Sequence, residues 1–381
     1  MSWFADELAL LDRQNRLRRP LALDHHSATV AHLDNRSVRV FGSNDYLGLR
    51  YHPVVVGAAI EWLRSGPVGA GASRLISGSS EIHHRLEQAL SQLLGTDAAL
   101  VVPSGFAANT GAIAAIAGPG DAIFSDRLNH ASIVDGCRLS GAKVHVFDHA
   151  STVDLERQLA AARPWRRGWV ITESLFSMDG DCPPLADIDR IARANGLHLY
   201  VDEAHALGTT GPAGAGLCST LGIRPTILVG TLGKSLGASG AFIAGDASTI
   251  HYLWNKARPH VFSTALAPVV AAAALAALQV LKSEPRLRDN LASNTHRLRA
   301  GLRMKGLVPG GANEAPIVPI LVGSDSQAVA LSAALLGDGY LVPPIRPPTV
   351  PEGSARLRIT ASAVHTHEEI DGLVESLARH A

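Results

Sequence analysis

Short runs of apolar and β-branched residues alternate with longer runs of helical periodicity between about residues 98 and 245. This alternation is typical of a largely parallel sheet in which a helix connects successive strands. Glycine and proline mark the junctions, as at Gly118–Gly120 and Pro183-Pro184. The pattern predicts seven strands (Ala98–Val102, Ala122–Ser125, Lys143–Phe147, Gly168–Thr172, His198–Val201, Ile227–Gly230 and Ala241–Ala244) and helices that include Phe106–Ala117, Ala131–Ser140 and Leu185–Asn195.

The rhythm changes after about residue 283, where a smaller α+β domain is expected. We predict three domain-level segments: an N-terminal segment over residues 1–45 that packs on the smaller domain, a large α/β domain over 46–282, and the small domain over 283–381. The elements expected in the small domain are a helix over Glu284–Lys305, a strand over Ile317–Val322, a helix over Ser326–Leu336, strands around Val342–Ile345 and Ala355–Thr360, and a terminal helix.

Composition narrows the possible partners and the compartment. The 34 Lys and Arg residues balance 34 Asp and Glu residues, so we do not expect the basic surface that nucleic-acid binding requires. Cys137, Cys182 and Cys218 fit neither a disulfide framework nor a zinc site, which favours a reducing, cytoplasmic location. The first residues also lack the basic start and apolar run of an export signal.

One stretch of the sequence can be interpreted either as a membrane span or as a buried helix. Pro259–Leu281 contains no Asp, Glu, Lys or Arg, but it holds His260 and Pro268, and about half of its apolar residues are alanine. Alanine contributes little to membrane insertion compared with larger apolar side chains. We therefore predict a buried helix after Pro268 and no membrane span.

Several familiar catalytic signatures are absent from the sequence. It contains no GxSxG, GxxxxGK[ST] or HExxH motif and no GxGxxG after a strand, so serine hydrolases, P-loop enzymes, zincins and simple Rossmann dehydrogenases lose support. The histidine pairs His25-His26, His83-His84 and His365 with His367 show no acidic or cysteine partner at ligand spacing. We therefore expect no metal site.

Polar residues follow several predicted strands, at the edge where open α/β sheets bind ligands. Gly105 and Phe106 begin a helix directly after a strand and offer backbone N–H groups to a phosphate. Asp202 and His205 follow another predicted strand, His198–Val201. A capping Asp and a packed His are equally compatible with that pattern.

Lys234 is set among small and apolar residues in Thr231–Gly237. A partly desolvated lysine has a lowered pKa and becomes a nucleophilic amine that can react with an aldehyde. Pyridoxal phosphate (PLP) requires such an amine, an acid for its ring nitrogen and a phosphate seat. Together, Lys234, Asp202 and the helix start at Gly105 predict PLP as the cofactor.

Ordered motifs over nearly the whole chain resemble the α-oxoamine synthase family of fold-type I PLP-dependent enzymes. The resemblance implies an α/β fold with a mostly parallel seven-stranded sheet, helices on both faces, and a smaller C-terminal α+β domain. The stretches that carry it are Ser43–Leu49, Ser104–Asn109, Asn129–Ser132, Glu173–Gly180, Val201–His205, Thr231–Lys234, Ile345–Pro351 and Arg356–Thr360.

The resemblance also implies roles for individual residues. Lys234 is expected to hold PLP and to carry the Cα proton, Asp202 to pair with the ring nitrogen, and His130 to stack on the ring. The other cofactor-binding positions that it implies are Gly105, Phe106 and Thr231 at the phosphate, Ser177 and His205 beside the phenolic oxygen, and Thr264, with Ser263 beside it, from a neighbouring subunit.

Substrate positions follow in the same way. Arg358 is expected to pair bidentately with the amino-acid carboxylate. Alternatively, it or Arg356 forms an ion pair at the domain boundary, and Asn44 only forms a turn. The substrate contacts that the resemblance implies are Arg18, Asn44, His130, Thr349 and Arg358.

Ile345–Pro351 is similar to the family members that condense L-alanine with a pimeloyl thioester, carried by CoA or acyl carrier protein, in biotin biosynthesis. We therefore expect a decarboxylating acyltransferase that works as a homodimer with shared active sites. A family member that uses glycine or serine with a different acyl-CoA is the nearer alternative, and a non-catalytic PLP-binding protein is the more distant one.

Overall fold

The computed structural model describes residues 2–381 and divides the chain into two compact units. The cofactor unit, as we name it from the prediction above, comprises Leu49–Phe176 and Cys182–Arg288. The terminal unit comprises the segment up to Gly48, the short internal segment Ser177–Asp181, and Asp289–Ala381. The internal segment is a feature that the predicted boundaries at residues 45 and 282 did not include.

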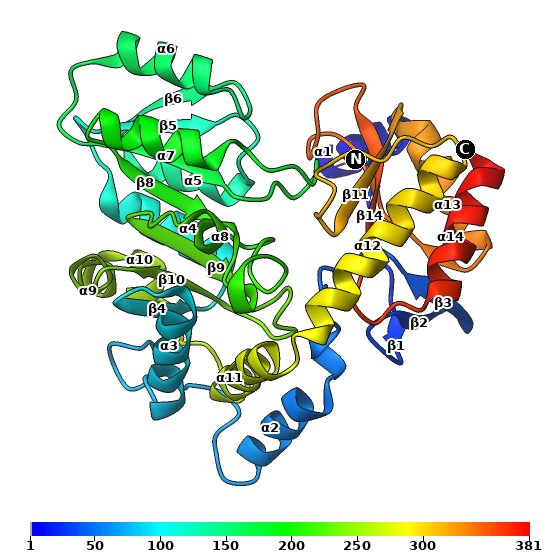
Figure 1. Cartoon of the computed structure of the whole chain (residues 1–381), viewed down its shortest axis with the longest axis horizontal. Helices are drawn as coiled ribbons and strands as arrows, with labels where there is room; N and C mark the ends of the chain where they lie inside the picture. The colour runs from blue at the N-terminus through cyan, green and yellow to red at the C-terminus, as the bar shows by residue number, and fades with distance from the viewer. Residues whose placement is uncertain (1) are drawn as a thin grey trace. The chain divides into compact units, whose positions relative to one another are not determined.

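A seven-stranded sheet forms the centre of the cofactor unit (Figure 1). Strand β10 is antiparallel to both of its neighbours, β4 and β9, and the remaining pairs are parallel. All strands except β10 therefore point the same way and end at one edge. In spatial order they are β4 (Ala98–Val102), β10 (Ala241–Gly245), β9 (Ile227–Thr231), β8 (His198–Asp202), β7 (Gly168–Glu173), β5 (Ala122–Asp126) and β6 (Lys143–Phe147).

The predicted seven strands and the fold class are confirmed, with one informative difference. Pairing continues through Glu173, Asp202 and Thr231, each one residue beyond the predicted strand end. These polar residues still make ladder hydrogen bonds, so their side chains are fixed in direction by the sheet itself. Three candidate polar side chains thus occupy the carboxyl edge on rigid backbone.

Helix α4 (Gly105–Ile116) shows how the sequence builds this unit. Its apolar residues are mostly alanine, and the stretch from Ala108 to Ile113 is buried against the sheet and α5 (Ala131–Ser140). Ser104 caps it by accepting the N–H of Ala107. The other helices of this unit are α2 (Pro53–Leu63), α3 (Glu81–Leu94), α6 (Thr152–Ala162), α7 (Leu185–Ala194), α8 (Leu217–Leu221), α9 (Ala247–Lys256), α10 (Arg258–Phe262) and α11 (Pro268–Ser283).

Helix α11 begins at Pro268, as predicted, and buries most of its alanines. In the part of the chain that the structure describes, no helix has both the length and the hydropathy that crossing a membrane requires.

The terminal unit contains two small sheets. One has the order β1 (Asp24–His25), β2 (Val30–Leu33), β3 (Arg36–Val40) and β12 (Tyr340–Leu341), and the other has the order β11 (Ile317–Gly323), β14 (Ala355–Thr360) and β13 (Pro344–Ile345). The helices are α1 (Trp3–Arg13), α12 (Arg286–Met304), which crosses the unit boundary, α13 (Asp325–Gly337) and α14 (His367–His380).

The single strand predicted around Val342–Ile345 is wrong. That region holds two short strands that belong to different sheets, with β12 parallel to β3 and β13 antiparallel to β14. Pro343 lies between them, and a proline cannot donate the backbone hydrogen bond that would continue one ladder. The chain therefore leaves the first sheet here and enters the second.

Candidate active site

Asp202 is the last residue of β8 and only 6% exposed. Both of its carboxylate oxygens accept hydrogen bonds from uncharged donors. Oδ1 accepts the N–H of Ala204 at 2.9 Å, and Oδ2 accepts Nδ2 of Asn109 at 2.7 Å. The carboxylate is therefore held in one orientation while its charge remains uncompensated by these two partners, which suits an acid that faces a protonated ring nitrogen.

Asn109 is a residue whose role the sequence reasoning missed. It is fully buried in α4, and its Oδ1 accepts the hydroxyl of Tyr200 at 2.7 Å. This contact fixes which end of the amide is Nδ2, and that nitrogen donates to both Asp202 and Ser132. Asn109 thus sets the direction of the Asp202 carboxylate. The available signal was a polar amide in the middle of an otherwise small and apolar helix, since buried polar groups are almost always hydrogen-bonded.

His130 is the N-cap of α5, and its protonation follows from its neighbours. Nδ1 accepts the N–H of Ser132 at 3.2 Å and lies 2.8 Å from the Ser132 hydroxyl. Because that hydroxyl oxygen accepts from Asn109, its own proton points to Nδ1 of His130. The ring proton is therefore assigned to Nε2. Burial lowers the pKa of His130, so the imidazole is neutral at physiological pH with Nε2–H as its donor.

Glu173, the last residue of β7, supports the same histidine from its backbone side. Its Oε1 accepts the N–H of His130 at 2.6 Å. Burial, and then the negative charge of Asp202, raise the pKa of Glu173 to about 8. The carboxyl is therefore largely protonated at neutral pH, so this edge of the sheet carries no second full negative charge beside Asp202. Glu173 lies within one of the motifs that carry the resemblance, but no role was expected for it.

Lys234 lies in the loop that follows β9. Its Nζ is 2.8 Å from Nε2 of His205, which follows β8. The loop needs glycine at position 237, where φ is +62° and a Cβ atom would lie 2.2 Å from the backbone N of Arg50. The amine and the imidazole that the sequence predicted at separate strand ends are therefore in direct contact.

The start of α4 and the end of β9 provide groups for a phosphate. The N–H groups of Gly105 and Phe106 belong to the first turn of a helix, where no intrahelical acceptor exists. A Cβ atom at Gly105 would meet no heavy atom within 4 Å, so this backbone is open to a ligand. Thr231 accepts the N–H of Gly233 and donates to the carbonyl of Gly240, which fixes its hydroxyl at the adjacent strand end.

Ser263 and Thr264 follow α10, and Thr264 is exposed. Neither residue joins the hydrogen bonds around Asp202 and Lys234 in residues 2–381. The expectation that they serve the site of a neighbouring subunit therefore stays a prediction.

In the terminal unit, Arg358 of β14 is 4% exposed and has neutral partners. Nε donates to the carbonyl of Ser177 at 2.6 Å, and Nη2 donates to Oδ1 of Asn44 at 3.1 Å and lies 3.5 Å from the hydroxyl of Tyr46. Arg356, by contrast, forms an ion pair with Asp179. A buried guanidinium without a carboxylate partner in the described chain suits an anionic ligand. Of the two arginines, Arg356 is the one in the ion pair, and Asn44 does more than form a turn.

Two further predicted substrate residues lie apart from these hydrogen bonds. Nη2 of Arg18 is 3.4 Å from the carbonyl of Pro347, and the N–H of Thr349 donates to the carbonyl of Arg346. Both residues therefore belong to the segment around Pro347, and among residues 2–381 neither is hydrogen-bonded to Arg358. Their roles stay predictions.

The expectation that the histidine pairs lack acidic partners is wrong in two cases. His26 lies 3.4 Å from a carboxylate oxygen of Asp24, and His84 lies 3.5 Å from one of Glu87. The second pair is a helical contact between residues three apart. The first pair joins two residues that are two apart in the β1–β2 hairpin.

The cofactor unit fits PLP in each requirement that the sequence raised. It has an amine in contact with an imidazole, a buried carboxylate held by neutral donors, a neutral histidine hydrogen-bonded into the same network, and an open helix start for a phosphate. The charges of Asp202 and Lys234 both act on His130, which agrees with these groups sharing one edge of the sheet.

Comparison with known proteins gives the same picture. The model of the family described as aminotransferase class I and II matches residues 36–377. The 8-amino-7-oxononanoate synthase of Methylococcus capsulatus is 46% identical over 341 residues, which covers 89% of this chain and 88% of that protein. The enzyme of the same name from Citrifermentans bemidjiense is 43% identical and covers 100% of this chain and 99% of its own.

Solved structures resemble the whole chain as well. Sphingomonas wittichii serine palmitoyltransferase has a TM-score of 0.93 and 32% identity, and the alignment covers 99% of this chain and 96% of that one. A structure of SPT with PLP has a TM-score of 0.94 and 30% identity over 100% of this chain and 98% of that one. The fold prediction and the dependence on PLP are confirmed.

Proposed function

Since the chain belongs to the aminotransferase class I and II family and, within it, to the 8-amino-7-oxononanoate synthases, we propose that it condenses L-alanine with a pimeloyl thioester. The reaction forms a bond between Cα of alanine and the thioester carbon, releases the thiol and CO₂, and takes up one proton to give 8-amino-7-oxononanoate for biotin biosynthesis. The acyl carrier is CoA or an acyl carrier protein. The observation that carries the proposed chemistry is the contact of Lys234 with His205 at the edge where Asp202 is buried.

PLP, when bound, supplies an electron sink for the carbanion that forms at Cα of the amino acid. Lys234 Nζ holds the cofactor through its aldehyde carbon and moves the Cα proton. Asp202 keeps the ring nitrogen protonated, and the two donors on its oxygens hold the carboxylate in place for that task. The N–H groups of Gly105 and Phe106 would bind the phosphate, and Thr231 would join them once its hydroxyl turned from the carbonyl of Gly240. Ser177 and His205 are assigned to the phenolic oxygen.

His130 has two tasks in this scheme. Its ring would stack on the bound cofactor, and its Nε2–H would donate to the oxygen of the thioester, where negative charge develops during the attack. Ser132 occupies Nδ1, so the proton stays on Nε2. Glu173 accepts the backbone N–H of His130 and so helps to hold the position of the ring.

Arg358 binds the carboxylate of the amino acid. The geometry supports this role because Nε and Nη2 are both oriented by neutral acceptors, so the guanidinium is held in place and its charge is available. Asn44 orients Arg358 and contributes to the substrate pocket. Arg18 and Thr349 are assigned to the acyl substrate.

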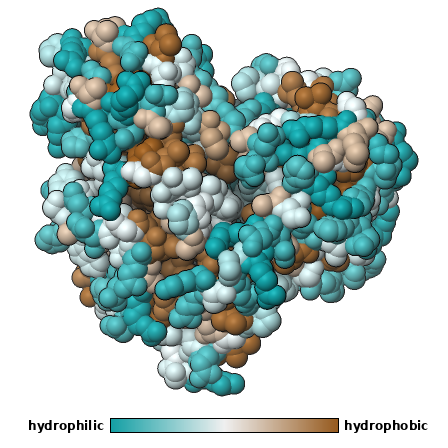
Figure 2. Space-filling model, viewed as in Figure 1, coloured by the Kyte–Doolittle hydropathy of each residue, from teal (hydrophilic) through white to brown (hydrophobic). Residues whose placement is uncertain are grey.

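We propose a homodimer in which Ser263 and Thr264 of one subunit complete the phosphate site of the other. Large apolar side chains are exposed on the cofactor unit, and those of α2 contribute to its hydrophobic surface (Figure 2). Phe106 is 48% exposed although it begins the proposed phosphate seat, and Phe262, next to Ser263, is 71% exposed. Exposed aromatic residues beside a ligand site are typical of an interface with another subunit.

We also propose a reducing, cytoplasmic location. No disulfide joins Cys137, Cys182 and Cys218 in the described part of the chain. Burial raises the pKa of Cys137 to about 12 and that of Cys218 further, so neither thiol is poised for oxidation.

A second candidate function is condensation of glycine or L-serine with another acyl-CoA. It is favoured by the similarity of fold to serine palmitoyltransferase, whereas the higher identity to the oxononanoate synthases favours alanine. The test is to incubate the PLP-loaded enzyme with pimeloyl-CoA and L-alanine, glycine or L-serine in turn, and to follow thiol release and product mass. We expect release with alanine and the mass of 8-amino-7-oxononanoate. Release only with glycine or serine would overturn the substrate assignment.

Lys234→Ala tests the chemistry in the same assay. We expect it to abolish turnover and the visible absorbance of lysine-bound PLP while far-UV circular dichroism stays unchanged. Full activity of this variant would overturn the assignment of Lys234, whichever amino acid the enzyme prefers.

A further inference from the structure

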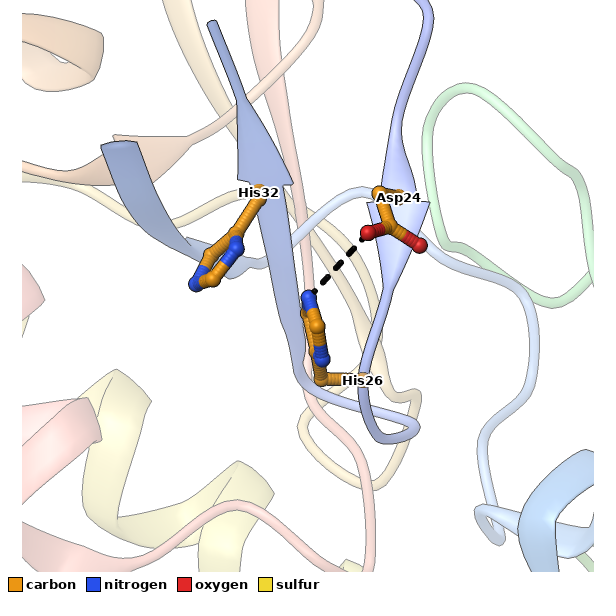
Figure 3. Close-up of side chains that lie close together, drawn as sticks. All are labelled: Asp24, His26 and His32. Atoms are coloured by element: carbon orange, nitrogen blue, oxygen red, sulfur yellow. Dashed lines mark ion pairs between the residues drawn. The ribbon is translucent and has the colours of Figure 1, made fainter. Parts of the chain in front are cut away.

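Asp24, His26 and His32 place three possible metal ligands on one face of the β1–β2 hairpin (Figure 3). Asp24 and His32 are directly opposite each other in the antiparallel pair, so their side chains project on the same side. His26 is two residues after Asp24, and alternate residues of an extended chain share a face. His25 and its partner Ala31 occupy the opposite face.

We propose that these three side chains bind a divalent transition-metal ion of the zinc class. Two imidazoles and one carboxylate are a ligand set that suits Zn²⁺, with water in the fourth position of a tetrahedral site. Ca²⁺ and Mg²⁺ prefer several oxygen ligands, and one carboxylate does not meet that preference. This inference does not depend on the proposed function.

The distances support a compact site. Zinc bonds of about 2.0–2.1 Å in a tetrahedron place neighbouring ligand atoms about 3.3–3.4 Å apart. Nε2 of His26 and Oδ2 of Asp24 are already 3.4 Å apart. One ligand atom from each of the three residues lies within 4.8 Å of the other two. The His26 and His32 rings are 4.1 Å apart between centroids and tilted by 51°, so the two imidazoles are direct neighbours.

The backbone that carries these ligands is held in place. The N–H of His26 donates to the carbonyl of Val30 at 3.0 Å, and Ser27 Oγ accepts the N–H of Val30 at 3.0 Å. Ala28 and Thr29 at the tip of the turn are buried, and the carbonyl of Thr29 accepts the N–H of Val40. The ligands therefore stand on a fixed turn, while the side chains of Asp24 and His26 are 79% and 49% exposed and open to an ion from solvent. A fixed scaffold reduces the entropy that is lost when the ion binds.

The test uses the full-length, PLP-loaded protein after removal of metal with a chelator. ZnCl₂ is titrated by calorimetry, and CoCl₂ by visible absorption, where intense d–d bands report tetrahedral coordination. We expect one ion per chain at the tightest site, and no response to MgCl₂. Because loss of a supporting outer-shell group already weakens metal binding by about 10- to 100-fold, His26→Ala and His32→Ala should each weaken it by at least about tenfold.

His25→Ala is the matched control, since this residue is adjacent in sequence but lies on the other face of the hairpin. It should leave the affinity for zinc unchanged, and all variants should keep the absorbance of bound PLP and the wild-type far-UV spectrum. Zinc affinity of His32→Ala equal to that of the wild type would overturn the proposal, and so would an equal loss in His25→Ala. Neither result bears on the condensation reaction, which is tested by its own products.

Discussion

Replacing Asn109 by alanine separates two tasks that one buried side chain performs. The amide holds the Tyr200 hydroxyl through Oδ1 and the Asp202 carboxylate through Nδ2. Tyr200→Phe is the matched variant, because it removes only the first of these contacts. Both variants break the hydrogen bond between these two side chains. Asn109→Ala leaves the Tyr200 hydroxyl without this partner, and Tyr200→Phe leaves Oδ1 of Asn109 without it.

The magnitudes follow from these contacts. A buried polar group left without its partner costs about 1–3 kcal/mol, so Tyr200→Phe should lose about that much free energy of unfolding without cofactor, and Asn109→Ala, which also removes the donor to Ser132 and Asp202, at least as much. A hydrogen bond to a charged group contributes about 1.5–3 kcal/mol. If the Nδ2 contact holds Asp202 against the ring nitrogen, its loss in Asn109→Ala should weaken PLP binding by about 10- to 150-fold, since about 1.4 kcal/mol corresponds to a factor of ten. Tyr200→Phe should retain most of the PLP affinity.

Two measurements are needed on each variant. Urea denaturation of the cofactor-free protein gives the free energy of unfolding, and titration with PLP, followed by its visible absorbance, gives the dissociation constant. We expect both variants to lose stability, Asn109→Ala at least as much as Tyr200→Phe because it also removes the donor to Ser132 and Asp202, and we expect clearly different dissociation constants. The reasoning would be refuted if Asn109→Ala bound PLP as tightly as the wild type, or if Tyr200→Phe weakened binding as much as Asn109→Ala did.

Three further predictions concern other parts of the chain. Arg358→Lys should raise the KM for the amino acid by about 10- to 100-fold because lysine lacks the planar fork, whereas Arg356→Lys, whose residue already pairs with Asp179, should change it much less; steady-state kinetics measures both. Burial lowers the pKa of His365 from its usual 6.5 to about 4, so the folded state resists protonation and stability falls as the pH drops from about 6.5 to about 4; His365→Gln should flatten that part of a stability profile measured by urea denaturation. Gly237→Ala should lower both PLP occupancy and thermal stability, because φ is positive there and the new methyl group would collide with the backbone N of Arg50. An unchanged absorbance spectrum and Tm would contradict this.

The central sheet was predictable because all its strands except the edge strand β6 are buried on both faces. Such strands are short apolar runs bounded by turn residues, and this pattern can be recognised in the sequence without knowing which strands are neighbours. The terminal unit was harder. The two-residue strands Asp24–His25 and Tyr340–Leu341 exist only because of pairing partners, and the second pairs with β3 from the other end of the chain. No local pattern records such a partner, so the sequence predicted only one strand there, around Val342–Ile345.

In the candidate active site, too, some features were predictable from the sequence and others were not. Lys234 and Asp202 stood out because a charged residue after a buried strand has few structural explanations. The role of Asn109 was invisible because it depends on Tyr200, Ser132 and Asp202, which come from three other segments. The tautomer of His130 likewise follows from contacts and not from sequence. The residue types that carry the chemistry were predictable, and the groups that orient them were not.

The pairing of β3 with β12 also has a consequence for synthesis on the ribosome. At about 5–20 residues per second, roughly 15–60 s separate the translation of Val40 from that of its partner Leu341. During this time the edge of β3 is open, and its exposed Arg36 and Arg39 oppose pairing with other nascent chains. The cofactor unit has all its residues once Arg288 is translated, roughly 4–14 s before Arg358. The order of translation thus allows the nascent protein to acquire its cofactor before it possesses Arg358, the residue that we propose binds the amino acid.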